Sequence, residues 1–333
     1  MNSFAGKLAV VTGGGSGIGR ELVCQLATAG CSVAACDWDA ESIADTAGLA
    51  QERATQGAIV SGHVCDVSKE ADVQRFRDEL LTRHATRHVD LVSNNAGIGG
   101  GASFLTASRE EWERTFAVDW WGVYYCTRTF LPLLIASQQG VLVNTSSVNG
   151  FWATLGPNMP NTAYATAKFA VKGFTEALIE DLRTHAPHVR AAVVMPGHVG
   201  TDIIANTRRA HRHTKPDALT DAQVQALVPP EARVKLARAG LLAADASDND
   251  VRRLLARRET EFRDKAPLSA AAAASAILDG IRAGAWRILV GQDAAALDAA
   301  IRAHPDAAYD YPALAKGTTD RPTLSRARAT PPE

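Results

Sequence analysis

The residues best suited to move a proton are Tyr164 and Lys168, four positions apart in the helical pattern of Ala163–Thr184. Residues at this spacing lie on the same face of a helix. A tyrosine hydroxyl has an ordinary pKa of about 10, and a neighbouring ammonium favours the phenolate. Lowering this pKa by ~3 units requires ~4 kcal/mol of differential stabilisation. Ser147, seventeen positions before Tyr164, offers a hydroxyl that could stabilise developing charge on an oxygen.

These residues also permit simpler interpretations. A Tyr and a Lys four apart on an arbitrary helix usually form a surface pair. Ser146 and Ser147 could mark a turn at a strand end, with Ser146 the competing hydroxyl. A Ser–Lys hydrolase with Ser147 as nucleophile is a further alternative, although no oxyanion-hole or nucleophile-elbow pattern accompanies it. The elements that position the residues must therefore decide.

A glycine-rich turn follows the first predicted strand, and a helical pattern begins at once. Its residues are Gly13, Gly14, Gly15, Ser16, Gly17, Ile18 and Gly19. Glycines allow backbone amides to approach an anion closely, and the N-terminus of the next helix favours a pyrophosphate. The position between the first strand and first helix indicates dinucleotide binding rather than a plain glycine-rich turn.

Asp37 ends the second predicted strand, eighteen positions after Gly19. A carboxylate there can accept hydrogen bonds from the ribose hydroxyls of an adenosine and would repel a 2′-phosphate. No Arg or Lys lies nearby in the sequence to neutralise that phosphate. The expected cofactor is therefore NAD rather than NADP. In the alternative interpretation Asp37, together with Asp39, only caps the following helix.

Short apolar runs alternate with amphipathic segments along most of the chain. This alternation predicts a single-domain α/β fold of the Rossmann type, a doubly wound parallel sheet of seven strands. The predicted strands are Lys7–Thr12, Ser32–Asp37, Ala58–Val64, Val89–Ser93, Gly140–Ser146, Val189–Met195 and Arg287–Val290. The predicted helices include Ile18–Ala29, Lys69–Arg83, Glu111–Ala136, Ala163–Thr184, Leu268–Ala283 and Asp293–Ala303.

The chain changes character after Gly200. Residues 202–266 are rich in charge, with helical patterns at Pro230–Ala239 and Asp250–Lys265 and no convincing strand, so we expect a helical lid. The domain is expected to span residues 1–316 including a C-terminal extension. Residues 317–333 are expected to form a mobile tail.

The composition excludes several classes of protein. The 333 residues carry 35 basic and 36 acidic side chains, which gives no reason to expect a nucleic-acid or membrane partner. Five cysteines without a CxxC pair indicate free thiols rather than disulfides or zinc. Without a signal peptide or a long apolar stretch, the protein is expected to be cytoplasmic. No metal is expected, the weaker alternative being a metal role for His211 and His213.

The motifs, taken in order, resemble those of the short-chain dehydrogenase/reductase family. The resemblance covers about Gly6 to Thr201, and loosely Leu268 to Gly291. It rests on the TGxxxGxG turn at Thr12–Gly19, Asp66-Val67, Asn94-Asn95-Ala96-Gly97, Ser147, Tyr164-x-x-x-Lys168, and Pro196-Gly197 leading to Thr201.

The resemblance implies an NAD-dependent oxidoreductase that interconverts a secondary alcohol and a ketone. It implies that Tyr164 is the acid and base, that Lys168 lowers its pKa and holds the nicotinamide ribose, and that Ser147 binds the substrate oxygen. It assigns the adenine to Asp66 and Val67, and a nicotinamide or phosphate contact to Thr201. Further cofactor contacts fall on Asn94, Ala96, Gly97, Pro196, Gly197 and Val199.

One position departs from the family pattern. The family usually has V-N-x-x-G here, whereas this chain reads Val118-Asp119-Trp120-Trp121-Gly122. Asp119 is nearly isosteric with Asn but lacks the amide donor. In the family that Asn supports a water chain to the lysine, so Asp119 is the relay position, and its charge could alter the pKa of the lysine. An NAD-binding sensor or scaffold is the second hypothesis, which the intact Ser147, Tyr164 and Lys168 disfavour.

The segment between Ser147 and Tyr164 is apolar and aromatic, which favours a lipophilic small-molecule substrate. The predicted substrate contacts are Phe151, Trp152, Met159 and His198. Alternatively the segment packs on itself and His198 is an ordinary loop residue. The segments Glu111–Ala136 and Ala163–Thr184 resemble those through which the family assembles, so we expect a homodimer, with a homotetramer as the alternative.

Overall fold

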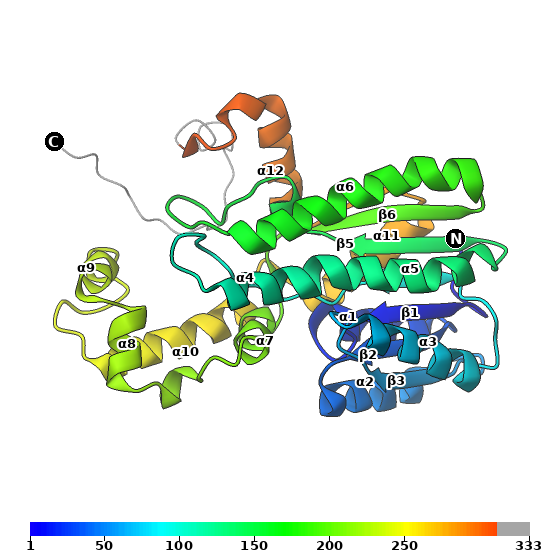
Figure 1. The fold of residues 1–333 in the computed structure, drawn as a ribbon, viewed down its shortest axis with the longest axis horizontal. Helices are drawn as coiled ribbons and strands as arrows, with labels where there is room; N and C mark the ends of the chain where they lie inside the picture. The colour runs from blue at the N-terminus through cyan, green and yellow to red at the C-terminus, as the bar shows by residue number, and fades with distance from the viewer. Residues whose placement is uncertain (312–333) are drawn as a thin grey trace.

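A parallel sheet of seven strands forms the centre of the computed structural model, which describes residues 1–311 (Figure 1). The strand order is β3-β2-β1-β4-β5-β6-β9. The strands are β1 Leu8–Thr12, β2 Ser32–Asp37, β3 Val60–Val64, β4 Leu91–Asn94, β5 Gly140–Thr145, β6 Val189–Pro196 and β9 Arg287–Val290. All seven predicted strands and the Rossmann-type fold are confirmed.

Helices cover both faces of the sheet. Because successive strand residues point to opposite faces, Val10 and Val11 of β1 belong to different apolar cores. Val11 packs with α1 (Gly17–Thr28), α2 (Ala40–Arg53) and α11 (Ala270–Arg282). Val10 lies in the core on the other face, beneath α3 (Glu70–Arg83), α5 (Gly122–Ile135) and α6 (Thr162–His185).

Helix α2, which is not among the examples named above, begins after its cap Asp39, whose carboxylate accepts from the Ser42 amide. Two local predictions need correction. The segment Glu111–Ala136 is α4 (Arg109–Phe116) and α5 joined by a π-helical turn, Ala117–Trp121. The predicted helix start at Leu268 is wrong, because Leu268–Ser269 (β8) pairs with Val199–Gly200 (β7) and Ser269 caps α11.

The strand order reverses between β1 and β4. β1 is followed in space by β2 and β3 on one side, and by β4, β5 and β6 on the other. In doubly wound sheets a ligand binds in the crevice at the carboxyl ends of the strands at such a reversal. The predicted glycine turn and the segment Asn94–Gly97 begin at the carboxyl ends of β1 and β4.

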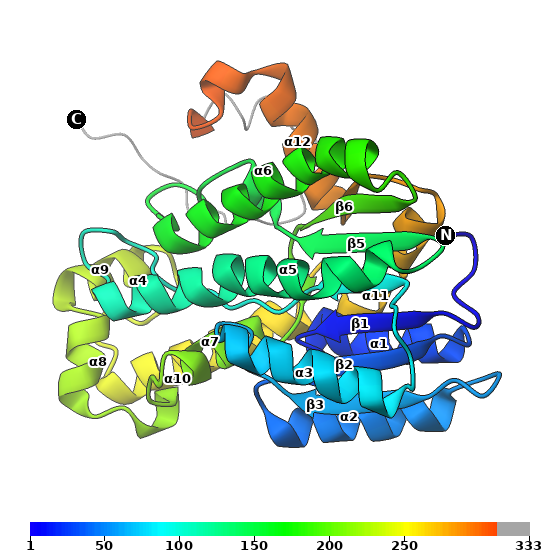
Figure 2. The same cartoon turned by 45° about the vertical axis from the view of Figure 1, so that its right-hand side comes forward.

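The helical character predicted for residues 202–266 is confirmed. The segment contains α7 (Ile203–Ala210), α8 (Asp221–Leu227), α9 (Pro230–Arg238) and α10 (Asp248–Asp264). Figures 1 and 2 show α8, α9 and α10 projecting beyond the carboxyl ends of the strands. They share a small apolar core of Leu219, Val224, Val228 and Val251.

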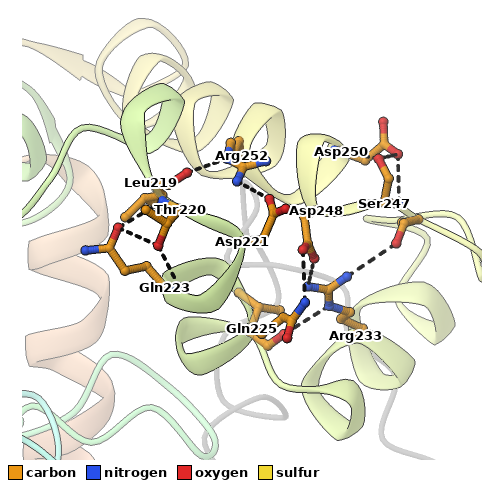
Figure 3. Close-up of polar contacts among 12 residues, drawn as sticks. Leu219, Thr220, Asp221, Gln223, Gln225, Arg233, Ser247, Asp248, Asp250 and Arg252 are labelled. Atoms are coloured by element: carbon orange, nitrogen blue, oxygen red, sulfur yellow. Dashed lines mark hydrogen bonds and ion pairs between the residues drawn. The ribbon is translucent and has the colours of Figure 1, made fainter.

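Polar contacts also hold the projecting helices to one another (Figure 3). Arg252 of α10 donates to the carbonyl of Leu219 at 2.8 Å and pairs with Asp221 at the start of α8. Arg233 of α9 pairs with Asp248 at the start of α10. The projecting helices therefore form a packed unit, and their role as a lid stays a prediction.

The C-terminal extension lies against the segment after β5. It comprises α12 (Gln292–Ala303) and a 3₁₀ turn, Pro305–Ala307. The indole Nε1 of Trp152 donates to the Ala308 carbonyl at 2.7 Å. The predicted tail, residues 317–333, lies outside the described residues. Within residues 1–311 the five cysteines are free and buried, and no helix combines the length and apolarity needed to span a bilayer.

Candidate active site

The three predicted catalytic residues meet where β5 ends and α6 begins. The Lys168 ammonium lies 5.3 Å from the centroid of the Tyr164 ring and donates to the Thr145 carbonyl at 3.2 Å. Ser147 lies near enough to Tyr164 to lower the pKa of its hydroxyl, and the Ser147 hydroxyl accepts from the Asn149 amide at 3.1 Å. Ser146, the competing hydroxyl, instead donates to the Lys168 carbonyl at 2.7 Å and is buried. Its role is to fix α6 against β5.

Asp119 is fully buried beside Lys168, in the π-helical turn before α5. Its Oδ1 accepts from the Ile98 amide at 3.0 Å and lies 3.5 Å from the Lys168 ammonium. Its Oδ2 has no hydrogen-bond partner among residues 1–311. Burial raises the pKa of Asp119 to about 6, against the opposing effects of Lys168 and of the Ile98 amide. The relay position thus carries a titratable, incompletely satisfied carboxyl group.

The electrostatics around Tyr164 differ from the prediction. Burial raises the pKa of Tyr164, and the charge of Asp119 raises it further. Lys168 and Ser147 lower the pKa but do not overcome burial. The prediction of a lowered pKa considered the ammonium of Lys168, and it applied the charge of Asp119 to the lysine and not to the tyrosine. In the protein alone Tyr164 is therefore held as the neutral phenol.

The glycine turn has the shape of a phosphate cradle. Gly13 and Gly17 have φ of +66° and +53°, in the region that glycine favours. A Cβ on Gly13 would lie 2.8 Å from the Ala96 Cα, and one on Gly19 would lie 1.9 Å from the Gly13 carbonyl oxygen. The side chain of Ser16 precedes α1 without capping it. The first amides of α1 are thus available to an anion, which fits a pyrophosphate.

Asp37 lies beside this turn. Its Oδ2 accepts from the Gly15 amide at 3.0 Å and its Oδ1 from the Asp39 amide at 3.1 Å. Burial raises its pKa. The helix cap is Asp39 and not Asp37, so the interpretation of Asp37 as a mere cap is wrong. The contact of this carboxylate with a ribose stays a prediction.

Two residues predicted to contact the cofactor bind neighbouring protein groups instead. Asn94 is buried and donates to Asn144 at 2.8 Å and to Thr127 at 3.1 Å, so its side chain ties β4 to β5 and α5. Asp66 accepts from the Ser68 hydroxyl at 2.6 Å and pairs with Arg114 at 3.2 Å. Both side chains order the strand ends, and their cofactor contacts stay predictions.

The remaining predicted cofactor residues lie along the rim of the site. The Ala96 amide donates to the Thr12 hydroxyl at 3.1 Å, and Gly97 faces Asp119 and Lys168. Val67 packs on Gly122, and Thr201 packs against Gly17. At the end of β6, Pro196 pairs with β9 and Gly197 faces Asp293. Val199 pairs with β8. Ile18 is partly buried against the core of α1.

Several site residues were not predicted. Asn95 donates to the Thr12 carbonyl at 3.1 Å and holds the glycine turn. On α7, Asn206 donates to the Ser16 hydroxyl at 3.0 Å, and Thr207 accepts from the Gly99 amide at 2.7 Å. Arg209 pairs with Asp39 at 2.5 Å. Asn95 is adjacent to predicted residues, whereas nothing in the local pattern of α7 indicates which loops its side chains reach.

Most predicted substrate contacts are engaged in packing. His198 bonds the Phe262 carbonyl at 2.8 Å and so ties α10 to the end of β6. Arg287 lies over the ring of Phe151 at 5.8 Å, and Trp152 is buried under the C-terminal extension. Met159 is 50% exposed. His211 bonds the Gly99 carbonyl at 3.0 Å, and residues 1–311 hold no group of ligands that could bind a metal.

Comparison with known proteins agrees with this geometry. The family profile described as short chain dehydrogenase matches residues 7–212, more than half of the chain. The chain belongs to the short-chain dehydrogenase family. The oxidoreductase SadH of Mycobacterium tuberculosis is 39% identical over 206 residues, 62% of this chain and 71% of that protein.

Two solved structures extend the likeness to bound cofactors. A short-chain dehydrogenase/reductase from Burkholderia phymatum in complex with NAD has a TM-score of 0.70 at 27% identity, over 97% of this chain and 100% of that one. A metagenomic short-chain oxidoreductase in complex with NADP has a TM-score of 0.51 at 30% identity, over 58% and 83%. The chain is thus an oxidoreductase of a family that uses both nicotinamide cofactors.

The raised pKa of Asp119 yields a test of its burial. The pKa of the Asp119 carboxyl is about 6 in the folded protein, against an ordinary value of 3.8. Burial therefore destabilises the folded protein least when this carboxyl is protonated. The contribution of the protonated carboxyl to stability is lost as pH rises from about 4 to 6. Asp119→Asn mimics the protonated form at every pH. The variant should gain up to about 3 kcal/mol of unfolding free energy over the wild type between pH 4 and pH 7. Urea titrations measure this, and the exposed Asp78→Asn serves as the control; a pH-independent difference would contradict the burial effect.

Proposed function

We propose that this protein interconverts a secondary alcohol and a ketone by hydride transfer with NAD(H). The convergence of Ser147, Tyr164 and Lys168 at the end of β5, beside an open phosphate cradle, carries the proposal. When bound, the nicotinamide supplies or accepts the hydride. The protein must then orient the substrate and manage one proton.

Each catalytic side chain has one task. Ser147 donates a hydrogen bond to the substrate oxygen, which stabilises charge there. Tyr164 gives a proton to this oxygen during reduction and takes it during oxidation. Lys168 stabilises the phenolate and holds the nicotinamide ribose. Since burial holds Tyr164 as the neutral phenol, its resting form is that of a proton donor, which suits carbonyl reduction.

The cofactor and substrate class rest on fewer observations. Asp37 beside Gly15 supports NAD. The hairpin after Trp152 exposes Leu155 by 46% and Met159 by 50%, which supports a lipophilic substrate. A homodimer and a cytoplasmic location stay predictions.

An NAD-binding sensor on the same fold is the second candidate. The buried charge of Asp119 and the raised pKa of Tyr164 favour it, because both reduce phenolate formation. The presence of Ser147, Tyr164 and Lys168 together at one place favours the enzyme candidate over the sensor candidate.

Replacement of Tyr164 by Phe separates the two candidates. For an enzyme, Tyr164→Phe should lower kcat by ~10²–10⁴, since it removes general acid–base catalysis, while the Kd for NADH stays within about threefold. Steady-state rates and calorimetric binding measure the two effects. Tyr125→Phe on α5 is the matched control. Full turnover in Tyr164→Phe would overturn the assignment of the proton to Tyr164.

Asp119→Asn should change the pH profile of the same reaction. The charge of Asp119 raises the pKa of Tyr164, so its removal lowers that pKa. Alcohol oxidation requires the phenolate, and the acid limb of kcat/KM should therefore move to lower pH. An unshifted limb would show that Asp119 is not electrostatically coupled to the proton-transferring group.

A panel of alcohols tests the substrate class. Formation of NADH should occur with apolar secondary alcohols and be weak with charged polyols. Repetition with NADP⁺ tests the role of Asp37, and Tyr164→Phe supplies the background rate. Turnover confined to charged polyols would refute a lipophilic substrate.

A further inference from the structure

Helix α7 brings a cation to the end of β2. Arg209 pairs with Asp39 at 2.5 Å across 170 positions of sequence, and its guanidinium lies 5.8 Å from the ring of Trp38. Its other nitrogen donates to Asn206 at 2.8 Å, and Asn206 reaches Ser16 in the glycine turn. Arg209 is therefore fixed on the route from the phosphate cradle to the proposed ribose carboxylate, Asp37.

The charges at this end of the site are unequal. Asp37 and Asp39 supply two carboxylates, and Arg209 supplies one cation, which pairs with Asp39. The Ser42 amide and, to a lesser extent, Arg209 lower the pKa of Asp39, which keeps its carboxylate charged. The Arg209 side chain is 42% exposed and that of Asp39 is 22% exposed, so the pair can separate without opening the core.

A 2′-phosphate on the adenosine ribose would experience both signs of charge. The carboxylates repel it, whereas a guanidinium binds phosphate oxygens through paired hydrogen bonds. We propose that Arg209 is a second determinant of cofactor choice, held by Asp39 and able to bind a 2′-phosphate when that carboxylate is neutralised. The inference rests on the proposed nicotinamide cofactor and adds to it a residue from the lid.

The proposal accounts for the position of Asp39 as both helix cap and ion-pair partner. As long as Arg209 is paired, the site presents net negative charge to the ribose and NAD is preferred. Once Asp39 is neutral, one repulsive charge disappears and Arg209 is free to turn to the phosphate. The loss of the repulsive charge does not depend on Arg209, whereas binding of the phosphate by the released guanidinium does. Removal of Arg209 therefore separates the two effects.

The test compares 2′,5′-ADP with 5′-ADP, which differ only by the 2′-phosphate. Asp39→Asn retains the cap on α2, because an Asn oxygen can accept from the Ser42 amide. In calorimetric titrations this variant should lower the ratio of the Kd for 2′,5′-ADP to that for 5′-ADP by tenfold or more. In Asp39→Asn combined with Arg209→Gln most of that gain should be lost. Binding of 5′-ADP should change by less than threefold in both.

Arg208→Gln is the matched control. Arg208 is the neighbouring cation on α7 but pairs with Glu259 of α10 at 2.8 Å, so its loss disturbs the lid and not the ribose end. In Arg208→Gln the ratio of the Kd for 2′,5′-ADP to that for 5′-ADP should equal the wild-type ratio. If the double variant retains the whole gain of Asp39→Asn, Arg209 has no role and the inference fails while the proposed function stands. If neither nucleotide nor NAD⁺ binds the wild type, both fail.

Discussion

The close approach of two backbone segments at the reversal of strand order governs the arrangement of the site. The turn after β1 passes so near the segment after β4 that a Cβ on Gly13 would lie 2.8 Å from the Ala96 Cα. Within the turn, a Cβ on Gly19 would meet the Gly13 carbonyl. Thr12 and Asn95 hold the two segments together through hydrogen bonds of 3.0 and 3.1 Å. Larger residues at either glycine would separate β1 from β4 and move α1 away from the crevice.

A second constraint is the burial of charge beside the predicted catalytic residues. Lys168 and Asp119 have almost no exposed surface and lie 3.5 Å apart. An ion pair in such a place pays a large desolvation penalty, and one carboxylate oxygen has no partner among residues 1–311. The arrangement therefore serves stability poorly. What it does affect is the pKa of Asp119 and of Tyr164, and these pKa values set the form in which Tyr164 rests.

The sequence predicts those features that depend on local pattern. Buried parallel strands are short apolar runs, so all seven are visible, as is the glycine turn between β1 and α1. Long-range pairing is not visible in this way. The π-helical turn that carries Asp119 looks like part of one helix, and Leu268–Ser269 look like the first turn of another until β7 is seen beside them. Trp152 looks like a substrate contact, but the C-terminal extension covers it.

The lid shows most clearly why local pattern is insufficient. Asn206, Thr207, Arg208 and Arg209 are consecutive, and on a helix consecutive side chains point about 100° apart. Each therefore reaches a different partner: Ser16, Gly99, Glu259 and Asp39. Three of these partners lie on loops at the carboxyl ends of β1, β2 and β4. One short helix thus joins the glycine turn, the end of β2 and the segment that faces Lys168 to the projecting helices. Any movement of α7 must break several of these contacts together, so the projecting helices and the loops at the carboxyl ends of the strands are mechanically coupled.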